Sequence, residues 1–448
     1  MATITPLKHV KPHSATRFDD LVRTRQAEIA IIGLGYVGLP LAVAYAQAGF
    51  RVLGIDIDAS RIDTLSRDHS PLADVPAAEI ATVRASGHLR VEESYDGLAH
   101  ADAIAICVPT PCTRNKQPDT SSIAAAARGV AEHLRPGQLV VLRSTSYPGT
   151  TEELVLPILE SGGLVVGRDI FLAFAPERVD PGRRDHTISN TPVIVGGVDA
   201  ESTRRAVRLF EQLGPQVVPV SSPAAAEMAK LLENVFRNVN IALVNQLAML
   251  CDRMGLDIWG IVDAAATKPY GFLPFHPGPG VGGHCIPVDP YYLAWKAREY
   301  DFHMDFIELA ARVNEEMPYH VVTKTLLALN GHRNRHPDVR VMILGVTFKR
   351  DIDDYRGSPA LKIMELLIQH GAKVSYHDPY VPKLAVGGRT FTSRPLTAAA
   401  LRAADCVLIV ADHSCLDFRW IVRHARLVVD TRNATREVDE GRVKIVRL

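Results

Sequence analysis

The sequence predicts an α/β protein with an N-terminal doubly wound sheet, a central core around one long helix, and a smaller C-terminal α/β domain. Short apolar runs alternate with helical stretches from residue 28, which is typical of a parallel sheet covered by helices. Residues 224–254 contain no Pro or Gly and carry apolar side chains at helical spacing, which predicts one long helix. The strand–helix alternation resumes at residue 340.

These patterns place the individual elements. We expect N-terminal strands at residues 28–33, 51–56, 103–108, 139–142, 171–175 and 193–195, and a helix at residues 37–48. A helix as long as residues 224–254 is expected between domains or in a subunit interface, and a Gly/Pro-rich stretch follows at 269–290. C-terminal strands are expected at residues 341–345, 373–377, 406–410 and 427–430, after a linker at 330–338. The expected divisions are an extension (1–27), an N-terminal domain (28–221), a central helical domain (222–329) and a C-terminal domain (330–448).

Composition excludes several classes of protein. The 448 residues are too many for one ordinary domain, and 47% of them are hydrophobic, enough for large cores. Basic and acidic residues number 50 each, so nothing points to nucleic acid or a membrane surface as partner. No apolar run is long enough to span a membrane, and residues 1–27 lack an apolar signal core. The six cysteines show no CxxC pair, which favours reduced thiols in the cytoplasm.

A glycine-rich turn follows the first predicted strand and opens the first predicted helix. It reads Gly33-Leu34-Gly35-Tyr36-Val37-Gly38. In this context the pattern predicts a Rossmann-type dinucleotide site, with the pyrophosphate at the helix N-terminus. Asp56 ends the second strand and favours NAD by binding the ribose hydroxyls, whereas Arg61, five residues on, could serve the 2′-phosphate of NADP. The alternative is a glycine turn used only for packing.

A second glycine-rich segment, residues 275–290, places four glycines before Cys285. Glycine lets the backbone approach a ligand closely, and a thiol on such a segment suits nucleophilic catalysis. Asp289 follows about one helical turn later. Cys112 is a second candidate, whereas Cys107, Cys251 and Cys406 lie in apolar patterns and are expected to be buried. We expect no metal at His284, because adjacent side chains point apart and no other ligand has zinc-like spacing.

Lys230 and Asn234 are four residues apart on the long helix and therefore share a face. If that face meets Cys285, Lys230 could stabilise an oxyanion and Asn234 could hold the substrate; a solvated Lys and an ordinary Asn is the alternative. A nicotinamide cofactor with a cysteine implies oxidation of a thiohemiacetal to a thioester, which water cleaves to an acid. The C-terminal domain has no GxGxxG, and its basic pair Lys349-Arg350 fits a single nucleotide or is simply a solvated pair.

From about residue 28 onward, the chain resembles the UDP-glucose/GDP-mannose dehydrogenase family. Seven ordered blocks carry the resemblance: IAIIGLGYVGLPLA, VPTP, RSTSYPGTTEE, APERVDPG, AEMAKLLENVFRNVNIALVNQ, PGPGVGGHCIPVDPYYL and GVTFKRDIDDYRGSP. The resemblance implies an NAD domain, a central helical dimer core and a UDP-sugar domain. It further implies two successive oxidations at C6 of the sugar, with two NAD reduced per sugar, and at least a homodimer.

The resemblance also implies roles for individual residues. Cys285 matches the nucleophile, Lys230 and Asn234 the catalytic lysine and its partner, and Asp289 the acid that activates water or tunes the thiol. Thr145 and Glu177 match residues that position water. Thr110 and Arg356 join the cofactor site, and the implied substrate-binding residues are Glu177, Arg178, Lys230, Asn234, Gly280, Gly282, Gly283, Phe348 and Lys349.

One position departs from many members of the family. Val288 stands where UDP-glucose members often carry Lys, and the blocks around Glu177 and Cys285 resemble the N-acetylhexosamine branch. Within it, Pro287 and Tyr291-Tyr292 favour the UDP-N-acetylglucosamine 6-dehydrogenases, which supply N-acetylated uronic acids for bacterial surface polysaccharides. The alternatives are a UDP-glucose or UDP-N-acetylmannosamine dehydrogenase, a catalytically silent nucleotide-sugar binding protein, and a two-electron hydroxyacid dehydrogenase. A silent protein would lack Cys285, Lys230 or Asp289, and the hydroxyacid enzymes lack the C-terminal domain and the GGxC segment.

Overall fold

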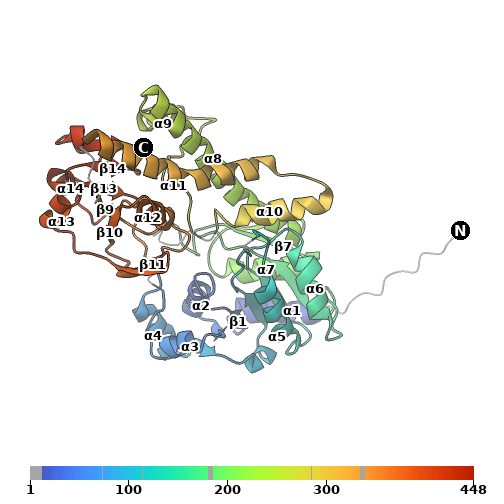
Figure 1. Ribbon diagram of the computed structural model, residues 1–448. Helices are drawn as coiled ribbons and strands as arrows, with labels where there is room; N and C mark the ends of the chain where they lie inside the picture. Colours follow the sequence, from blue (N-terminus) through green and yellow to red (C-terminus); the bar gives the residue numbers. More distant parts are fainter. Residues whose placement is uncertain (1–12, 73, 114, 180–184, 284, 333–338) are drawn as a thin grey trace. The chain divides into compact units, whose positions relative to one another are not determined.

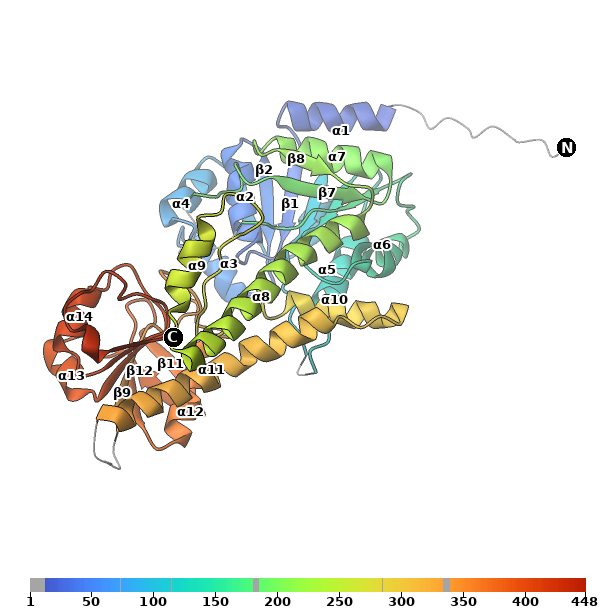
Figure 2. The same ribbon diagram turned by 90° about the horizontal axis from the view of Figure 1, so that it is seen from above.

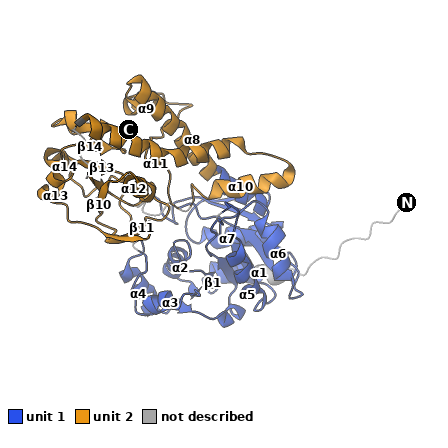
Figure 3. Ribbon diagram, viewed as in Figure 1, with its two compact units in different colours: residues 1–232 blue, residues 233–448 orange. Residues whose placement is uncertain are grey.

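The computed structural model describes residues 13–72, 74–113, 115–179, 185–283, 285–332 and 339–448. The chain forms two compact units, Met1–Leu232 and Glu233–Leu448 (Figure 3). Helix α8 (Pro223–Met254) belongs to both, because the boundary falls within it. It matches the long helix predicted at residues 224–254. Among the described helices, none has both the length and the apolar content needed to cross a membrane.

The N-terminal unit is built around an eight-stranded sheet in the order β3-β2-β1-β4-β5-β6-β7-β8. Its neighbouring strands are parallel, except that β6 and β7 pair antiparallel. The strands are β1 (Glu28–Ile32), β2 (Arg51–Ile55), β3 (Leu89–Glu92), β4 (Ala103–Ile106), β5 (Leu139–Leu142), β6 (Phe171–Phe174), β7 (Val193–Gly197) and β8 (Val217–Pro219). The α/β class with a doubly wound sheet is confirmed, and the strand order reverses between β1 and β4, where such sheets bind ligands. The short edge strands β3 and β8 were not predicted.

Helices lie on both faces of this sheet (Figures 1 and 2). They are α1 (His13–Arg23), α2 (Gly38–Gln47), α3 (Ala59–Ser66), α4 (Ala77–Ala85), α5 (Ser121–Ala131), α6 (Leu156–Glu160) and α7 (Ala200–Glu211), with a π-helical turn (Thr151–Val155) before α6. Strand β1 shows why both faces are covered: Ile29 and Ile31 enter one hydrophobic core, and Ala30 and Ile32 enter the other. Successive side chains of a strand point to opposite faces, so a strand buried on both sides is apolar throughout.

Helix α1 corrects the expectation that residues 1–27 are only an extension. Phe18 and Val22 are buried in the same core as β1, and α1 packs against α7 (Figure 2). Arg204 on α7 forms an ion pair with Asp19 at 2.6 Å. Phe18, Leu21 and Val22 are spaced for one helix face, which is the signal that the polar composition of the segment concealed.

The C-terminal unit holds a five-stranded parallel sheet in the order β10-β9-β13-β14-β15, and a two-stranded hairpin, β11-β12. The strands are β9 (Arg340–Leu344), β10 (Lys373–His377), β11 (Lys383–Val386), β12 (Arg389–Thr392), β13 (Cys406–Ile409), β14 (Val428–Asp430) and β15 (Ile445–Arg447). The helices are α9 (Ile258–Ala266), α10 (Asp289–Ala297), α11 (Asp305–His332), α12 (Pro359–Gln369), α13 (Ala398–Ala403) and α14 (Phe418–His424). The hairpin and β15 were not predicted.

The predicted linker at residues 330–338 is partly wrong. Helix α11 continues to His332, so residues 330–332 are helical, and residues 333–338 lie outside the described ranges. A glycine such as Gly331 costs a helix about 1 kcal/mol, which the last turn of a 28-residue helix tolerates. The turn preferences of Gly331 and Asn334 therefore indicated the end of the helix only approximately.

Candidate active site

Of the three motif glycines in the turn after β1, only Gly35 has open space where a side chain would be. Gly33 has φ +89°, and a Cβ there would lie 2.7 Å from the Cys107 carbonyl oxygen. A Cβ on Gly38 would lie 1.8 Å from the Gly33 oxygen, whereas a Cβ on Gly35 would meet nothing within 4 Å. Gly33 and Gly38 are thus required for packing at the start of α2. Gly35 faces open space, as the approach of a pyrophosphate requires.

Asp56 lies beside this turn at the end of β2 and is buried. Its Oδ2 accepts hydrogen bonds from the Leu34 amide and from Arg61 Nη1, both at 2.7 Å, and its Oδ1 accepts one from the Asp58 amide at 2.9 Å. Arg61 is therefore held by Asp56. Of the other predicted cofactor residues, Tyr36 is exposed and Val37 packs against the core beside α2.

Thr145 and Thr110, predicted from different blocks, are joined directly. The Thr110 hydroxyl donates to the Thr145 carbonyl oxygen at 2.7 Å. The segment after Thr145 is tied to α8 by Glu227, which sequence reasoning missed. Its buried carboxylate accepts hydrogen bonds from the Gly149 amide at 2.6 Å, the Thr151 amide at 2.9 Å and the Thr151 hydroxyl at 2.7 Å. Burial raises the pKa of Glu227 to about 7, against the lowering effect of these donors.

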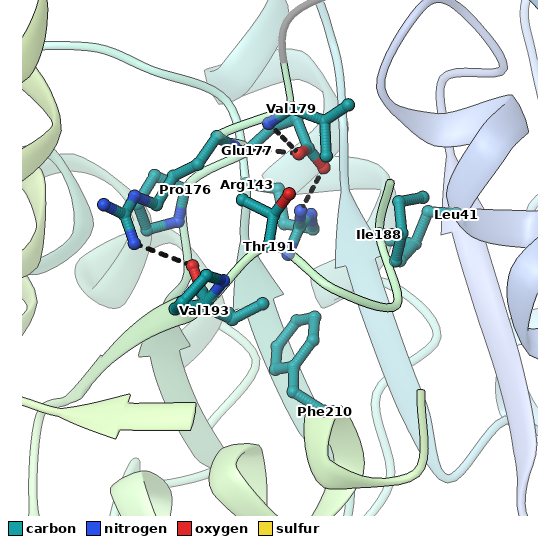
Figure 4. A pocket seen from close by; sticks show the side chains of 11 residues that line it. Leu41, Arg143, Pro176, Glu177, Val179, Ile188, Thr191, Val193 and Phe210 are labelled. Carbon is teal, nitrogen blue, oxygen red and sulfur yellow. Dashed lines mark hydrogen bonds and ion pairs between the residues drawn. The ribbon is translucent and has the colours of Figure 1, made fainter. Parts of the chain in front are cut away.

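Glu177 is held in a small pocket of the N-terminal unit (Figure 4). Its Oε1 accepts hydrogen bonds from the amides of Arg178 and Val179, at 2.8 and 2.7 Å. Its Oε2 accepts one from Arg143 Nη2 at 2.6 Å. Arg178 lies next to it and donates from Nη1 to the Pro192 carbonyl oxygen. Arg143 was not singled out from the sequence, although a charged residue directly after an apolar strand was the available signal.

Cys285 begins a turn that leads into α10. Its carbonyl oxygen accepts hydrogen bonds from the amides of Val288 at 3.2 Å and Asp289 at 2.8 Å, and its side chain is exposed. Asp289 is buried, and its Oδ2 accepts a hydrogen bond from Asn234 Nδ2 at 2.6 Å. The C-terminal unit thus brings Cys285, Asp289 and Asn234 together. Lys230 lies one turn before Asn234 on α8 and is also buried.

A ladder of buried asparagines positions the glycine-rich segment before Cys285. Asn314 on α11 donates to Asn238 Oδ1 at 2.7 Å, and Asn245 donates to Asn314 Oδ1 at 2.9 Å. The Asn245 oxygen accepts the Gly278 amide at 2.9 Å. These hydrogen bonds link the three side-chain amides in a chain, which stabilises one arrangement of α8, α11 and the segment. Sequence reasoning missed these residues because asparagines at helical spacing carry no signal of their own.

The same segment packs on residues predicted to bind substrate. A Cβ on Gly282 would lie 2.6 Å from Phe348 Cβ, and one on Gly283 would lie 2.9 Å from the Phe348 ring. The Gly283 amide donates to the Arg356 carbonyl oxygen at 3.3 Å. The Arg356 guanidinium itself pairs with Asp354 at 2.7 Å. Gly280 has φ +129°, a conformation that other residues rarely adopt.

Phe348 and Lys349 lie after β9. Strands β10 and β13 both come later in the chain than β9, and they pair with it on opposite sides. This is the switch point at which open α/β sheets bind ligands. His413, after β13, is fully buried and accepts the Asp351 amide at Nδ1 at 3.0 Å. Because Nδ1 is an acceptor, Nε2 carries the proton and donates to Asp378 Oδ2 at 3.0 Å.

Asp378 and Arg432 complete this region. Asp378 also accepts the Val346 amide at 2.7 Å, as Asp56 accepts the Leu34 amide in the N-terminal unit. Arg432, another residue missed in the sequence, donates from Nε to the Val410 carbonyl oxygen at 2.9 Å. Its Nη2 lies 3.5 Å from the Phe348 carbonyl oxygen. Arg350 lies within 3.6 Å of Asp412, so it is ion-paired and not merely solvated.

The cysteines divide by environment as predicted. Cys107, Cys251 and Cys406 are buried, and burial raises the pKa of both Cys107 and Cys406 to about 12, which suppresses thiolate formation. Cys112 is half-buried, and Cys285 and Cys415 are exposed. His284, for which no metal was expected, lies outside the described residues.

Comparison with known proteins identifies the fold and the family. Residues 27–214 match the NAD-binding domain of the UDP-glucose/GDP-mannose dehydrogenase family, residues 224–316 its central domain, and residues 342–437 its UDP-binding domain. The chain is 36% identical over 396 residues to a UDP-N-acetyl-D-glucosamine 6-dehydrogenase from Pseudomonas aeruginosa, covering 87% of this chain and 91% of that one.

Other relatives carry different sugar names. The chain is 36% identical to an NDP-N-acetyl-D-galactosaminuronic acid dehydrogenase from Ralstonia nicotianae, covering 90% of this chain and 95% of that one. The structure of a UDP-D-ManNAc dehydrogenase from Pyrococcus horikoshii superposes with a TM-score of 0.83 and 33% identity, covering 94% and 98% of the two chains.

The N-terminal unit carries the family's NAD-binding domain. Gly35 is open to a pyrophosphate, and the Arg61 that could bind a 2′-phosphate is engaged by Asp56. With a UDP-binding domain in the same chain, the protein is an NAD-dependent nucleotide-sugar dehydrogenase. The chain belongs to the UDP-glucose/GDP-mannose dehydrogenase family.

Proposed function

We propose that the protein oxidises the C6 hydroxyl of a UDP-N-acetylhexosamine, first of all UDP-N-acetylglucosamine, to the carboxylate through a thioester on Cys285. The observation that carries this proposal is the arrangement in the C-terminal unit. The exposed Cys285 thiol heads a turn whose Asp289 is held by Asn234. The glycines before it pack on Phe348, next to Lys349. The proposed nucleophile and the proposed nucleotide-binding segment therefore adjoin.

The proposal assigns cofactor binding mainly to the turn after β1 in the N-terminal unit. The residues of that unit that would hold the cofactor are Gly33, Gly35, Tyr36, Val37, Gly38, Asp56, Arg61 and Thr110. The family resemblance adds Arg356. NAD, when bound, supplies the hydride acceptor for both oxidations. The amides at the start of α2 would face the pyrophosphate, and Asp56 would bind the ribose hydroxyls.

The protein's own residues would carry out the steps other than hydride acceptance. The Cys285 thiol adds to the C6 aldehyde, forming a C–S bond as its proton passes to the carbonyl oxygen. After the second oxidation, C6 is a thioester. Water then bonds to C6 as the C–S bond breaks, so that sulfur regains one proton and the other is released with the carboxylate. Overall, one alcohol, one water and two NAD⁺ give one carboxylate, two NADH and three protons.

Each remaining residue has a defined task in this proposal. Lys230 would stabilise the negative charge on the C6 oxygen, Asn234 and Asp289 would orient the reacting groups, and Thr145 and Glu177 would position water. The nucleotide sugar would be bound by Arg178, Gly280, Gly282, Gly283, Phe348 and Lys349. A basic, partly buried Lys349 beside an aromatic Phe348 suits a diphosphate and a base, respectively.

The choice of sugar rests on similarity and on one residue. Relatives at 36% identity are named for UDP-N-acetyl-D-glucosamine and NDP-N-acetyl-D-galactosaminuronic acid, and Val288 stands where UDP-glucose enzymes often carry Lys. UDP-N-acetylmannosamine is the second candidate, because the enzyme with the 0.83 TM-score is named for it, and UDP-glucose is the third. The product would serve as a precursor of N-acetylated uronic acid polymers.

We also propose that the protein is a homodimer or a larger homo-oligomer. Helix α8 carries an exposed apolar stripe at helical spacing, formed by Met228, Leu232, Phe236, Leu243, Leu247, Leu250 and Met254. These residues lie on one side of the helix, and such a continuous apolar face marks an interface. A closed two-fold dimer buries the same face on both copies. Sedimentation of Leu243→Glu as a monomer, beside a dimeric parent, would support this assembly.

A substrate comparison tests the sugar and the reaction together. Purified protein is mixed with NAD and, separately, the UDP-activated forms of N-acetylglucosamine, N-acetylmannosamine, N-acetylgalactosamine and glucose, and absorbance of NADH is followed to completion. Two NADH per UDP-N-acetylglucosamine, with little from UDP-glucose, is the expected result. Turnover of UDP-glucose alone would overturn the branch, and one NADH per sugar would overturn the four-electron reaction.

A cysteine variant tests the thioester. Cys285→Ser should abolish formation of the acid and leave NAD affinity unchanged, because the predicted cofactor turn is in the N-terminal unit. Cys415→Ser is the matched control, since Cys415 is the other exposed cysteine in the C-terminal unit. Full uronate production by Cys285→Ser would refute the covalent mechanism.

A further inference from the structure

Arg143 is a buried arginine at the carboxyl end of β5. Its amide donates to the Ile106 carbonyl oxygen at 2.9 Å, so its backbone still follows the sheet. Its side chain is 2% exposed and lies over the Phe210 ring, with the guanidinium carbon 5.0 Å from the ring centroid. A guanidinium so far from solvent requires a counter-charge. Glu177 supplies it at 2.6 Å.

With this contact, both oxygens of the Glu177 carboxylate accept hydrogen bonds. The amides of Arg178 and Val179 hold Oε1, and Arg143 holds Oε2. The backbone donors follow Glu177 directly and therefore move with it. Arg143 comes from a different strand, 34 residues earlier, so its bond is the one that fixes the carboxylate relative to the sheet.

A cavity of about 10 Å³ adjoins this pair (Figure 4). Arg143 and Thr191 both line it. Within the described residues, Arg143 Nε and Nη1 and the Thr191 hydroxyl are buried without a hydrogen-bond partner. A cavity of this size holds about one water, and buried waters occupy sites with two to four polar partners. The cavity thus has the size and the polar groups for a single bound water.

We propose that Arg143 is a positioning residue for Glu177, and that a water held between Arg143 and Thr191 keeps its guanidinium in place. The inference rests on the proposed function, in which Glu177 positions the water that cleaves the thioester. Cleavage needs a defined carboxylate orientation, whereas the two oxidations transfer hydride to the cofactor. Loss of the Arg143 contact should therefore slow thioester hydrolysis more than either oxidation.

The experiment follows a single turnover with UDP-N-acetylglucosamine, or with whichever UDP-sugar the parent protein oxidises. NADH release is recorded by stopped flow, and the covalent Cys285 adduct is measured by intact-protein mass spectrometry. Arg143→Lys and Thr191→Val are compared with Glu177→Gln as reference. Arg168→Lys is the control, because Arg168 is an exposed arginine paired with Asp169 in the same unit.

Hydrolysis in Arg143→Lys should fall about 10-fold to 100-fold, the loss of one charged hydrogen bond. The adduct should accumulate as in Glu177→Gln, with NAD affinity unchanged and a smaller effect in Thr191→Val. Hydrolysis at the parent rate in Arg143→Lys would overturn the proposal. If Arg143→Lys does not fold, Thr191→Val decides, since it keeps the ion pair, and absence of any slowing there would overturn the proposal. Absence of adduct in Glu177→Gln would instead refute the role of Glu177 in the proposed function.

Discussion

The Asn234 side chain donates to Asp289 Oδ2 at 2.6 Å, across 55 residues of sequence. Both residues are buried, so α8 fixes the carboxylate that lies one turn after Cys285. Loss of a buried hydrogen bond to a charged group costs about 1–3 kcal/mol.

Asn234→Ala should therefore lower turnover at least 10-fold and the free energy of unfolding by about 1–3 kcal/mol. Asn240→Ala is the control, because Asn240 lies on the same helix, is half-buried, and its side chain donates locally to the Phe236 carbonyl oxygen. Steady-state kinetics and urea unfolding measure the two effects. Equal turnover of the two variants would contradict a role for Asn234 at the site.

Asp56→Ala should weaken selection for NAD over NADP by about 10-fold or more, because the variant loses the ribose acceptor and releases Arg61 to meet a 2′-phosphate. The ratio of kcat/KM for the two cofactors is the measurement. Asp63→Ala is the control, since Asp63 on α3 forms an exposed pair with Arg67 at the end of that helix. An unchanged ratio in Asp56→Ala would show that Asp56 does not read the ribose.

Gly38→Ala and Gly35→Ala should differ in kind. The methyl group added in Gly38→Ala would collide with the backbone of Gly33. The free energy of unfolding should therefore fall by about 1–3 kcal/mol, and NAD affinity should fall as well. The Gly35 methyl meets no protein atom, so stability should stay unchanged while NAD affinity falls. Thermal unfolding and NAD titration separate the two. Normal NAD affinity in Gly35→Ala would place the pyrophosphate elsewhere.

Glu227 should make stability depend on pH. Its pKa is raised from 4.5 to about 7 by burial, so between these values the folded protein binds more protons than the unfolded chain. Its contribution is fully present below pH 4.5 and is lost as pH rises through 7, by about 3 kcal/mol in total. Urea unfolding from pH 4.5 to 8 should show this decline in the parent and not in Glu227→Gln. Parallel curves for the two proteins would refute it.

His413→Leu should weaken binding of UDP about 10-fold and leave NAD affinity unchanged. The leucine can neither accept the Asp351 amide nor donate to Asp378 as His413 does, so the segment carrying Phe348 and Lys349 loses an anchor. Calorimetric titration with UDP and with NAD measures both. His424→Leu is the control, because the His424 hydrogen bond is local, to the Trp420 carbonyl oxygen on its own helix. Unchanged UDP affinity would contradict this anchoring.

Features that depend on local spacing could be predicted from the amino-acid sequence. The glycine turn at Gly33–Gly38, the helix now seen as α8, the glycines before Cys285 and the buried state of Cys107, Cys251 and Cys406 all follow from patterns within a few residues of one another. A helix face repeats every three or four residues, and a buried strand is an apolar run. Such signals can be read from the order of residues alone, and they were enough to predict the α/β class and the family resemblance.

The contacts that position these features join residues far apart in the sequence and are seen only in the folded protein. Arg143 meets Glu177 across 34 residues, Asn245 meets Gly278 across 33, and His413 meets Asp351 across 62. Helix α1 was not predicted because its segment is polar in composition, and the structure shows that it packs on α7. Hydrogen bonds and ion pairs depend on distance in space, and a single sequence records no distance between residues of different elements. Arg143 therefore looks like any charged residue after a strand until the fold places Glu177 beside it.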